Sequence, residues 1–99
     1  MKNILLEDCT KTLATCLEIL TRKNADYATD RNPFENFKNS EVVGVSMERG
    51  LLVRVMDKIS RINVLIDKEP DVVEESINDT INDAIGYLAI LSSMLKNNK

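Results

Sequence analysis

The segment from Met47 to about Asp67 constrains the fold more than any other feature of the chain, because it is apolar around most of its circumference when read as a helix. Its apolar residues are Leu51, Leu52, Val53, Val55, Met56, Ile59, Ile62, Val64, Leu65 and Ile66. A helix that is apolar on most sides has to be buried on more than one side. The rest of the chain, or another copy of it, is therefore expected to cover this segment from several directions.

Two further segments carry the spacing of three and four that is typical of amphipathic helices. The first runs from about Asn3 to Lys23, with apolar positions at Leu6, Cys9, Leu13, Cys16, Leu17 and Leu20. The other runs from Pro70 to about Leu95, with a predicted core face of Ile77, Ile81, Ala84, Ile85, Leu88 and Leu95. Ser46 is placed to cap the middle helix. No alternating strand pattern occurs. We predict an all-α fold, a helical bundle of three long helices joined into one domain spanning residues 1–99.

Charge and composition exclude several classes of function. The net charge is −3, with acids and bases mixed along the chain, so neither duplex nucleic acid nor an anionic membrane surface is an expected partner. No apolar run reaches the roughly 18 to 20 residues that span a bilayer, and the first residues lack the layout of a signal peptide. We expect a cytoplasmic protein. The chain has no histidine, which removes the usual zinc sites and catalytic triads.

The two cysteines are expected to be free thiols packed in the core. Cys9 and Cys16 are seven residues apart, which places them about 10 Å apart along one helical face, too far for a disulfide.

The connector between the first two helices, which runs from about Arg22 to Asn39, holds three of the chain's four aromatic residues, namely Tyr27, Phe34 and Phe37. Two interpretations fit. The rings can fold back to cap the core, as large apolar side chains in a loop usually do. Alternatively, one of them stacks on a nucleobase, whose edge Asn24, Asp26 or Asn32 would read.

The middle helix has a single charged stripe, made of Arg54, Asp57, Lys58 and Arg61. Such a stripe can be the solvent face and nothing more. It can also line a cleft that binds phosphate oxygens, because arginine holds these through two parallel hydrogen bonds.

The third helix carries a strip that is acidic in its first half and apolar in its second. Asp79 and Asp83 lie one turn apart, and such a pair can share Mg²⁺ or simply pair with the cations of the middle helix. The strip continues as Tyr87, Ile90 and Met94. We favour oligomerisation over an intramolecular contact for this apolar half, so that a homo-oligomer formed through the third helix would complete the bundle.

Three sequence blocks give the chain a family resemblance. RKNADY with NPFENF, then LLVRVMDKISRI, then EESINDTINDAIGYLAIL, resemble the phage and bacterial family called nucleotide modification associated domain type 1, which is related to the MazG-like all-α nucleoside triphosphate pyrophosphohydrolases. The match spans about residues 22–91. The resemblance implies nucleotide binding by Lys23, Asn24, Asp26, Tyr27, Asn32, Phe34, Arg54, Lys58 and Arg61.

The metal motif of the MazG-like enzymes is thinned in this chain. Those enzymes hold metal with an EExxE segment and a later ExxD segment. Here Thr80 takes the place of the glutamate in the second segment, and the first is missing. The remaining candidates for Mg²⁺ are Asp79, Asp83, Asp57 and Glu48.

Three functions are therefore open. The first is a nucleotide-binding protein that sequesters a nucleotide signal or a modified nucleotide, phage-encoded and acting in the host cytoplasm. The second is a Mg²⁺-dependent pyrophosphohydrolase that cleaves nucleoside triphosphates, dNTPs or modified dNTPs to monophosphates. The third is a helical interaction protein whose stripes are all interfaces. The first is preferred, because the chain offers fewer carboxylates than the enzyme pattern requires.

Overall fold

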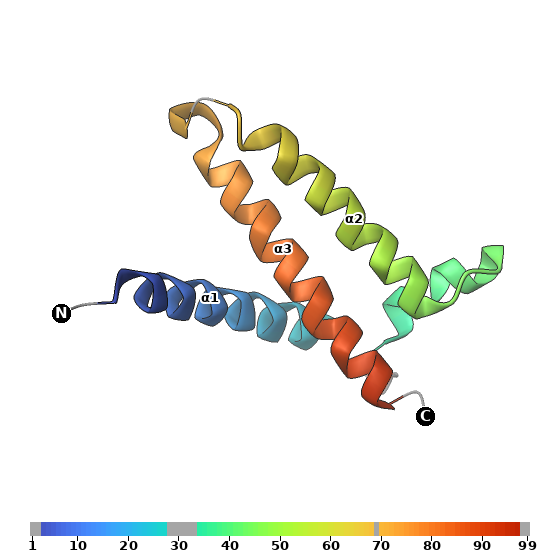
Figure 1. Ribbon diagram of the computed structural model, residues 1–99. Helices are drawn as coiled ribbons and strands as arrows, with labels where there is room; N and C mark the ends of the chain where they lie inside the picture. The colour runs from blue at the N-terminus through green and yellow to red at the C-terminus, as the bar shows by residue number, and fades with distance from the viewer. Residues whose placement is uncertain (1–2, 28–33, 69, 98–99) are drawn as a thin grey trace.

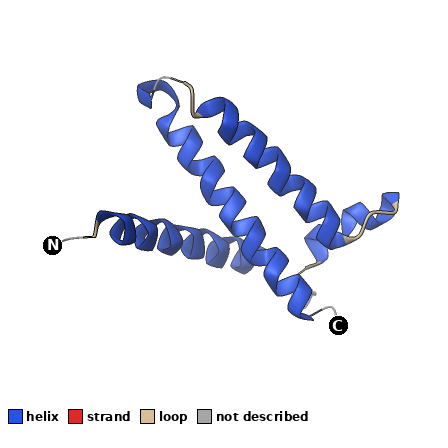
Figure 2. Cartoon of the chain, in the orientation of Figure 1, coloured by secondary structure: helices blue, strands red, loops and turns tan. Residues whose placement is uncertain are grey.

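The computed structural model describes residues 3–27, 34–68 and 70–97, with side chains described outside 25–27 and 70–76. Over these residues the chain is helical and contains no strand, which confirms the all-α prediction (Figure 2). The elements in chain order are α1 (Ile4–Tyr27), the 3₁₀ helix η1 (Glu35–Val43), α2 (Met47–Leu65) and α3 (Pro70–Asn97).

The central unit is an antiparallel hairpin of α2 and α3, which pack side by side along their length (Figure 1). Its core holds Met47, Leu51 and Met94, and partly buried Phe34, Phe37, Tyr87, Ile90 and Leu91 pack around them. η1 packs on the first turns of α2, and α1 crosses α3 without approaching α2. The three long helices therefore do not close around one shared core.

The helix boundaries agree in part with the predicted ones. Ser46 caps α2 as predicted, since its side-chain oxygen accepts a hydrogen bond from the backbone N–H of Arg49 at 3.2 Å. α1 continues to Tyr27, one turn past the predicted end at Lys23, because nothing in that turn forbids a helix. α2 ends slightly earlier and α3 slightly later than predicted. The last part of the predicted connector, from Glu35, belongs to the 3₁₀ helix η1, which continues to Val43 and which the sequence pattern did not reveal.

The apolar strip of the third helix makes an intramolecular contact, which corrects the preference for an intermolecular one. Met94 is fully buried, and Tyr87 and Ile90 pack against the same core. Two residues of the predicted core face, Leu88 and Leu95, are instead 47% and 54% exposed. The reason is that α3 is apolar over a wide arc, so periodicity alone cannot choose which part of that arc meets α2.

α2 is buried on one side only. Met47, Leu51 and Val55 form its buried stripe, which half-buried Ile62 and Leu65 continue, whereas the other apolar positions are exposed. These exposed positions are Leu52, Val53, Met56, Ile59, Val64 and Ile66. The expectation that α2 is covered from several directions is therefore not met within one chain.

The two cysteines have different environments. Cys16 is buried where α1 meets α3, as predicted, but Cys9 is exposed because the first half of α1 extends beyond the hairpin (Figure 1). Both thiols are free, as predicted.

A close backbone approach joins η1 to α2. The Ser40 hydroxyl lies 3.1 Å from the Ser46 carbonyl oxygen and donates to it. A methyl group added at Gly50 would lie 2.6 Å from both the Cβ and the Oγ of Ser40, closer than side-chain carbons ever lie. Gly44, with a φ of 80°, turns the chain from η1 toward α2 in the left-handed region that favours glycine. Glycine at position 50 is therefore required for η1 to reach its place.

We predict that Gly50→Ala lowers the free energy of unfolding by about 1 to 3 kcal/mol, because the added methyl group forces η1 away from α2. Gly86→Ala is the matched control: its methyl group would lie 3.7 Å from the nearest side-chain atom, an ordinary contact with Leu20. Since alanine favours a helix interior, this control should be neutral or stabilising by up to about 1 kcal/mol. Urea unfolding followed by circular dichroism measures both. Equal effects of the two substitutions would contradict the close approach.

Candidate functional site

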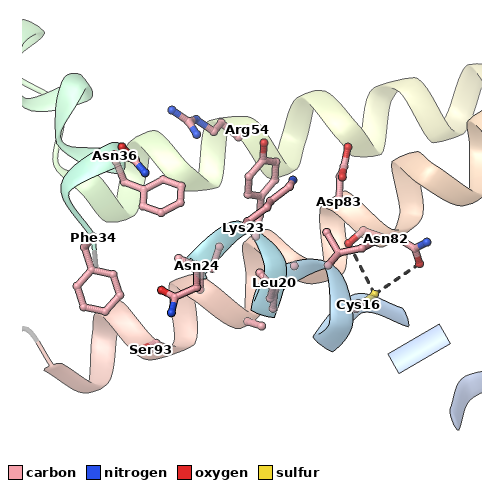
Figure 3. A pocket seen from close by; sticks show the side chains of 16 residues that line it. Cys16, Leu20, Lys23, Asn24, Phe34, Asn36, Arg54, Asn82, Asp83 and Ser93 are labelled. Atoms are coloured by element: carbon pink, nitrogen blue, oxygen red, sulfur yellow. Dashed lines mark hydrogen bonds between the residues drawn. The ribbon is translucent and has the colours of Figure 1, made fainter. Parts of the chain in front are cut away.

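A cleft of about 450 Å³ is lined by residues from all four helices (Figure 3). Its apolar walls come from α1, η1 and α3, and include Leu20, Phe34, Phe37, Tyr87 and Ile90. Its polar groups are Lys23, Asn24, Asn36, Arg54, Asn82, Asp83 and Ser93. The cleft thus combines aromatic surfaces with several amide groups and two cations.

Arg54 lies between two aromatic rings at the edge of this cleft. Its guanidinium carbon is 5.3 Å from the centre of the Phe37 ring and 6.0 Å from that of the Tyr87 ring. Both distances are within the range of cation–π attraction, worth about 0.5 to 1 kcal/mol at an exposed site. The two rings, one from η1 and one from α3, therefore restrain the guanidinium without using its N–H donors.

A second, more polar cleft of about 350 Å³ adjoins the first. It is lined by Arg54, Asp57, Lys58, Arg61 and Tyr87. The whole charged stripe predicted from the sequence thus lines a concave surface. Arg54 and Tyr87 belong to both clefts, so an elongated ligand can occupy the aromatic cleft at one end and the cationic cleft at the other.

An ion pair links α2 to α3 between the clefts. The Lys58 ammonium lies 3.1 Å from a carboxylate oxygen of Asp83, and the two side chains are 29% and 34% exposed. Pairs of this exposure contribute up to about 1 kcal/mol, because water screens them. The main effect of the Lys58–Asp83 ion pair is to orient the Lys58 side chain, which it holds across the boundary between the two clefts.

The structure brings together most of the predicted nucleotide-binding residues that it describes. Lys23, Asn24, Phe34 and Arg54 line the aromatic cleft, and Lys58 and Arg61 line the cationic one. Asp26 and Tyr27 belong to the last turn of α1, but their side chains lie outside the described set, and Asn32 lies outside the described residues.

Sequence reasoning missed one wall of the aromatic cleft. It is formed by Asn82, Gly86, Ala89 and Ser93, which are small or polar residues on α3. Their spacings of four, three and four place them on one helical face. A stripe of small residues at this spacing on an otherwise apolar helix is a signal that could have located the cleft.

The predicted metal ligands do not gather. Among the described residues, no three acidic or cysteine side chains lie close enough together to hold a metal ion. Asp83 is paired with Lys58, Asp57 lines the cationic cleft, and Asp79 is exposed. Glu48 begins α2 beside the end of α3, while Asp79 lies near the other end of the antiparallel hairpin. These four carboxylates therefore do not form one Mg²⁺ site, and no chemical step is assigned to a metal.

Cys16 contributes a buried thiol to the wall of the aromatic cleft. Its sulfur lies 3.5 Å from the side-chain oxygen of Asn82 and 3.8 Å from the backbone oxygen of the same residue, as the dashed lines of Figure 3 show. Burial, and to a smaller extent the negative charge of Asp83, raise the pKa of the Cys16 thiol. The thiol is therefore a protonated hydrogen-bond donor at neutral pH.

No helix in the described part of the chain is long and apolar enough to cross a membrane. Comparisons of the chain with protein-family models, with curated proteins and with solved structures find no match.

We predict that Cys16 reacts with iodoacetamide more slowly than an unperturbed thiol and that its reaction profile lies at higher pH. The raised pKa means that the unfolded chain loses this proton before the folded one. The folded state therefore gains stability from keeping this thiol protonated. The gain is complete below pH 9.0, the ordinary pKa of a cysteine, and it is lost as the pH rises through the higher pKa of the folded state. Mass spectrometry of Cys16 and Cys9 peptides measures both rates in one sample.

Asp83→Asn removes the smaller cause of this shift, so it should move the Cys16 profile part of the way back toward lower pH. Asp79→Asn, which changes an exposed carboxylate one turn away, is the control and should leave the profile in place. A Cys16 profile at or below that of an unperturbed thiol would show that the side chain is not buried against α3.

Proposed function

We propose that this protein binds a nucleotide, with the base in the aromatic cleft and the phosphates in the cationic cleft. One observation carries the proposal: the two clefts adjoin and share Arg54 and Tyr87. A nucleotide has the same division into a flat aromatic part and an anionic part.

The aromatic cleft suits a base in size and chemistry. Its volume of about 450 Å³ falls in the range of small-molecule sites, which is about 300 to 1,000 Å³. Stacking of a base on an aromatic side chain is worth about 1 to 3 kcal/mol, and Phe34, Phe37 and Tyr87 offer such surfaces. The amides of Asn24, Asn36 and Asn82 carry both donors and acceptors, which is what reading a base edge requires.

The cationic cleft suits phosphate. Its three cations, Arg54, Lys58 and Arg61, have two carboxylates beside them, Asp57 in the lining and Asp83 paired with Lys58, so the net charge is positive. Guanidinium groups bind phosphate oxygens through paired hydrogen bonds, and the rings beside Arg54 leave its N–H groups available for this. A bound phosphate would compete with Asp83 for Lys58.

Binding without hydrolysis is the preferred form of this function. Pyrophosphohydrolysis needs carboxylates that gather around Mg²⁺, and no three of the four candidates, all of them described, lie close enough together to do so. Sequestration of a nucleotide signal or modified nucleotide by a phage-encoded homo-oligomer fits the family resemblance and needs only the two clefts.

The proposal is tested by incubating the purified protein with Mg²⁺ and a panel of dNTPs, cyclic oligonucleotides and ADP-ribose derivatives. The protein is then separated from free ligand and denatured, and the released compounds are identified by chromatography. An intact nucleotide released on denaturation supports sequestration. Pyrophosphate with a monophosphate supports the hydrolase. No binding below about millimolar concentration by any member of the panel would refute both.

We predict that Arg54→Gln weakens binding of the nucleotide found in this panel by about 10-fold to 100-fold. The substitution removes a charged hydrogen-bond donor, which is worth about 1.5 to 3 kcal/mol. Arg49→Gln is the matched control, since Arg49 is an exposed arginine on the same helix that lines neither cleft. Isothermal titration calorimetry measures both affinities, and equal affinities for the two variants would place the phosphates elsewhere.

A further inference from the structure

The α2–α3 hairpin is covered on one face and bare on the other. α1 and η1 supply residues to the cleft that contains Arg54 and Tyr87, and the second cleft shares these two residues, so both clefts lie on one face of the hairpin. At 100° per residue, the opposite flank of each helix carries a second apolar stripe. We call the two stripes together the back face; they comprise Leu52, Met56, Ile59 and Ile66 of α2 with Leu88 and Leu95 of α3. Each of these side chains is between 43% and 66% exposed.

The back face carries no charge over most of its length. Along α2, between Leu52 and Ile66, the one further position on this stripe that the helix exposes is Asn63. Along α3, the neighbouring positions are half-buried Ile81 and Ile85 and exposed Ser92. An uncharged surface of this kind meets a copy of itself without opposing like charges.

The solvent-accessible surface of the chain is larger than expected for a compact monomer of its mass. A folded monomer of 11.2 kDa is expected to expose about 5,700 Å², whereas this chain exposes 7778 Å². The excess of about 2,000 Å² falls within the roughly 1,000 to 2,500 Å² that each subunit of an obligate homodimer buries. This excess is a property of the whole chain, including the exposed half of α1, and it is large enough to include an interface of this class on the back face.

We propose that a second copy of this chain docks on the back face, so that two α2–α3 hairpins pack face to face as a four-helix bundle. Each copy contributes two antiparallel helices with an apolar surface, and a two-fold axis pairs the same surface on both. Exposed apolar residues also occur on α1 and at Val42 and Val43 at the end of η1. Those of α1 lie on a single helix and are interspersed with Glu7, Asp8 and Lys11, and those of η1 are only two adjacent side chains. The back face is wider and uncharged.

This dimer buries the stripe of α2 made of Leu52, Met56, Ile59 and Ile66, and it leaves Val53 and Val64 outside the interface. It also leaves both clefts on the outside, since they open on the opposite face of each hairpin. Each chain therefore keeps its own complete cleft, and a dimer binds two ligands.

Ile59→Glu tests the interface. A carboxylate in the middle of the back face has to be buried or neutralised on dimerisation, so the dissociation constant should rise at least about 100-fold. The matched control is Val53→Glu, which introduces the same charge at a 57% exposed apolar position on α2 outside the back face. Sedimentation velocity of the ligand-free protein should give twice 11.2 kDa for the wild type and for Val53→Glu, and 11.2 kDa for Ile59→Glu. A monomeric wild type at about 100 μM would overturn the proposal, as would a dimer that Ile59→Glu leaves intact and Leu13→Glu in α1 dissociates.

A second measurement needs no variant and remains decisive if Ile59→Glu fails to fold. Met56 is 54% exposed in one chain, whereas Met47 and Met94 are 7% and 0% exposed. If the back face is covered, peroxide should oxidise Met56 in the concentrated wild-type protein at least about 10-fold more slowly than free methionine, and dilution should restore its reactivity. Oxidation of Met56 at the rate of free methionine, at concentrations where the protein sediments as a dimer, would place the interface elsewhere. Neither measurement involves a nucleotide, so failure here is distinct from failure of the proposed binding function.

Discussion

The contact of Met94 with Met47 and Leu51 is the constraint on which the rest of the structure depends. It fixes the end of α3 against the beginning of α2 and so sets the register of the antiparallel hairpin. In that register Lys58 faces Asp83, and Arg54 lies beside Tyr87. Phe37 of η1 then packs against the same core and closes over Arg54 from the other side. A shift of one helical turn would separate all of these pairs by about 5 Å.

A structural feature of this protein could be predicted from the sequence when it depends on local residue patterns, and could not when it depends on packing between distant segments. Amphipathic periodicity and the serine cap are local signals, and they correctly predicted three long helices and the start of α2. The choice of the face of α3 that meets α2 is not local. Tyr87, Ile90 and Met94 continue a strip that begins with two aspartates, so they were expected to meet another subunit, whereas they pack in the core that α3 forms with Met47 and Leu51 of α2. Periodicity reports that a helix has apolar sides but not which neighbour covers each side.

The candidate site shows the same contrast between local features, which the sequence predicted, and non-local features, which it did not. The arginines and lysine of α2 and the aromatic residues of the connector stand out by residue type, and the structure places those that it describes along two adjoining clefts. The opposite wall was missed because asparagine, glycine, alanine and serine on a helix usually have no special role. Their importance comes from α1, which crosses α3 at this point and makes the small residues into the floor of a cleft. A crossing between helices far apart in the sequence leaves little trace in either helix alone.

The attachment of α1 to α3 alone has a further consequence for the energetics of the molecule. Cooperative opening of part of a protein costs free energy in proportion to the contacts it breaks, and α1 can separate without disturbing the core of Met47, Leu51 and Met94. We therefore expect α1 to be the least protected part of the fold in amide exchange and the hairpin to be the most protected part. Since α1 supplies Leu20, Lys23 and Asn24 to the aromatic cleft, any molecule held there bridges a loosely attached unit to a firmly folded one. A molecule that binds only when α1 is docked on α3 therefore stabilises the docked state, and it should raise the protection of the α1 amides from exchange.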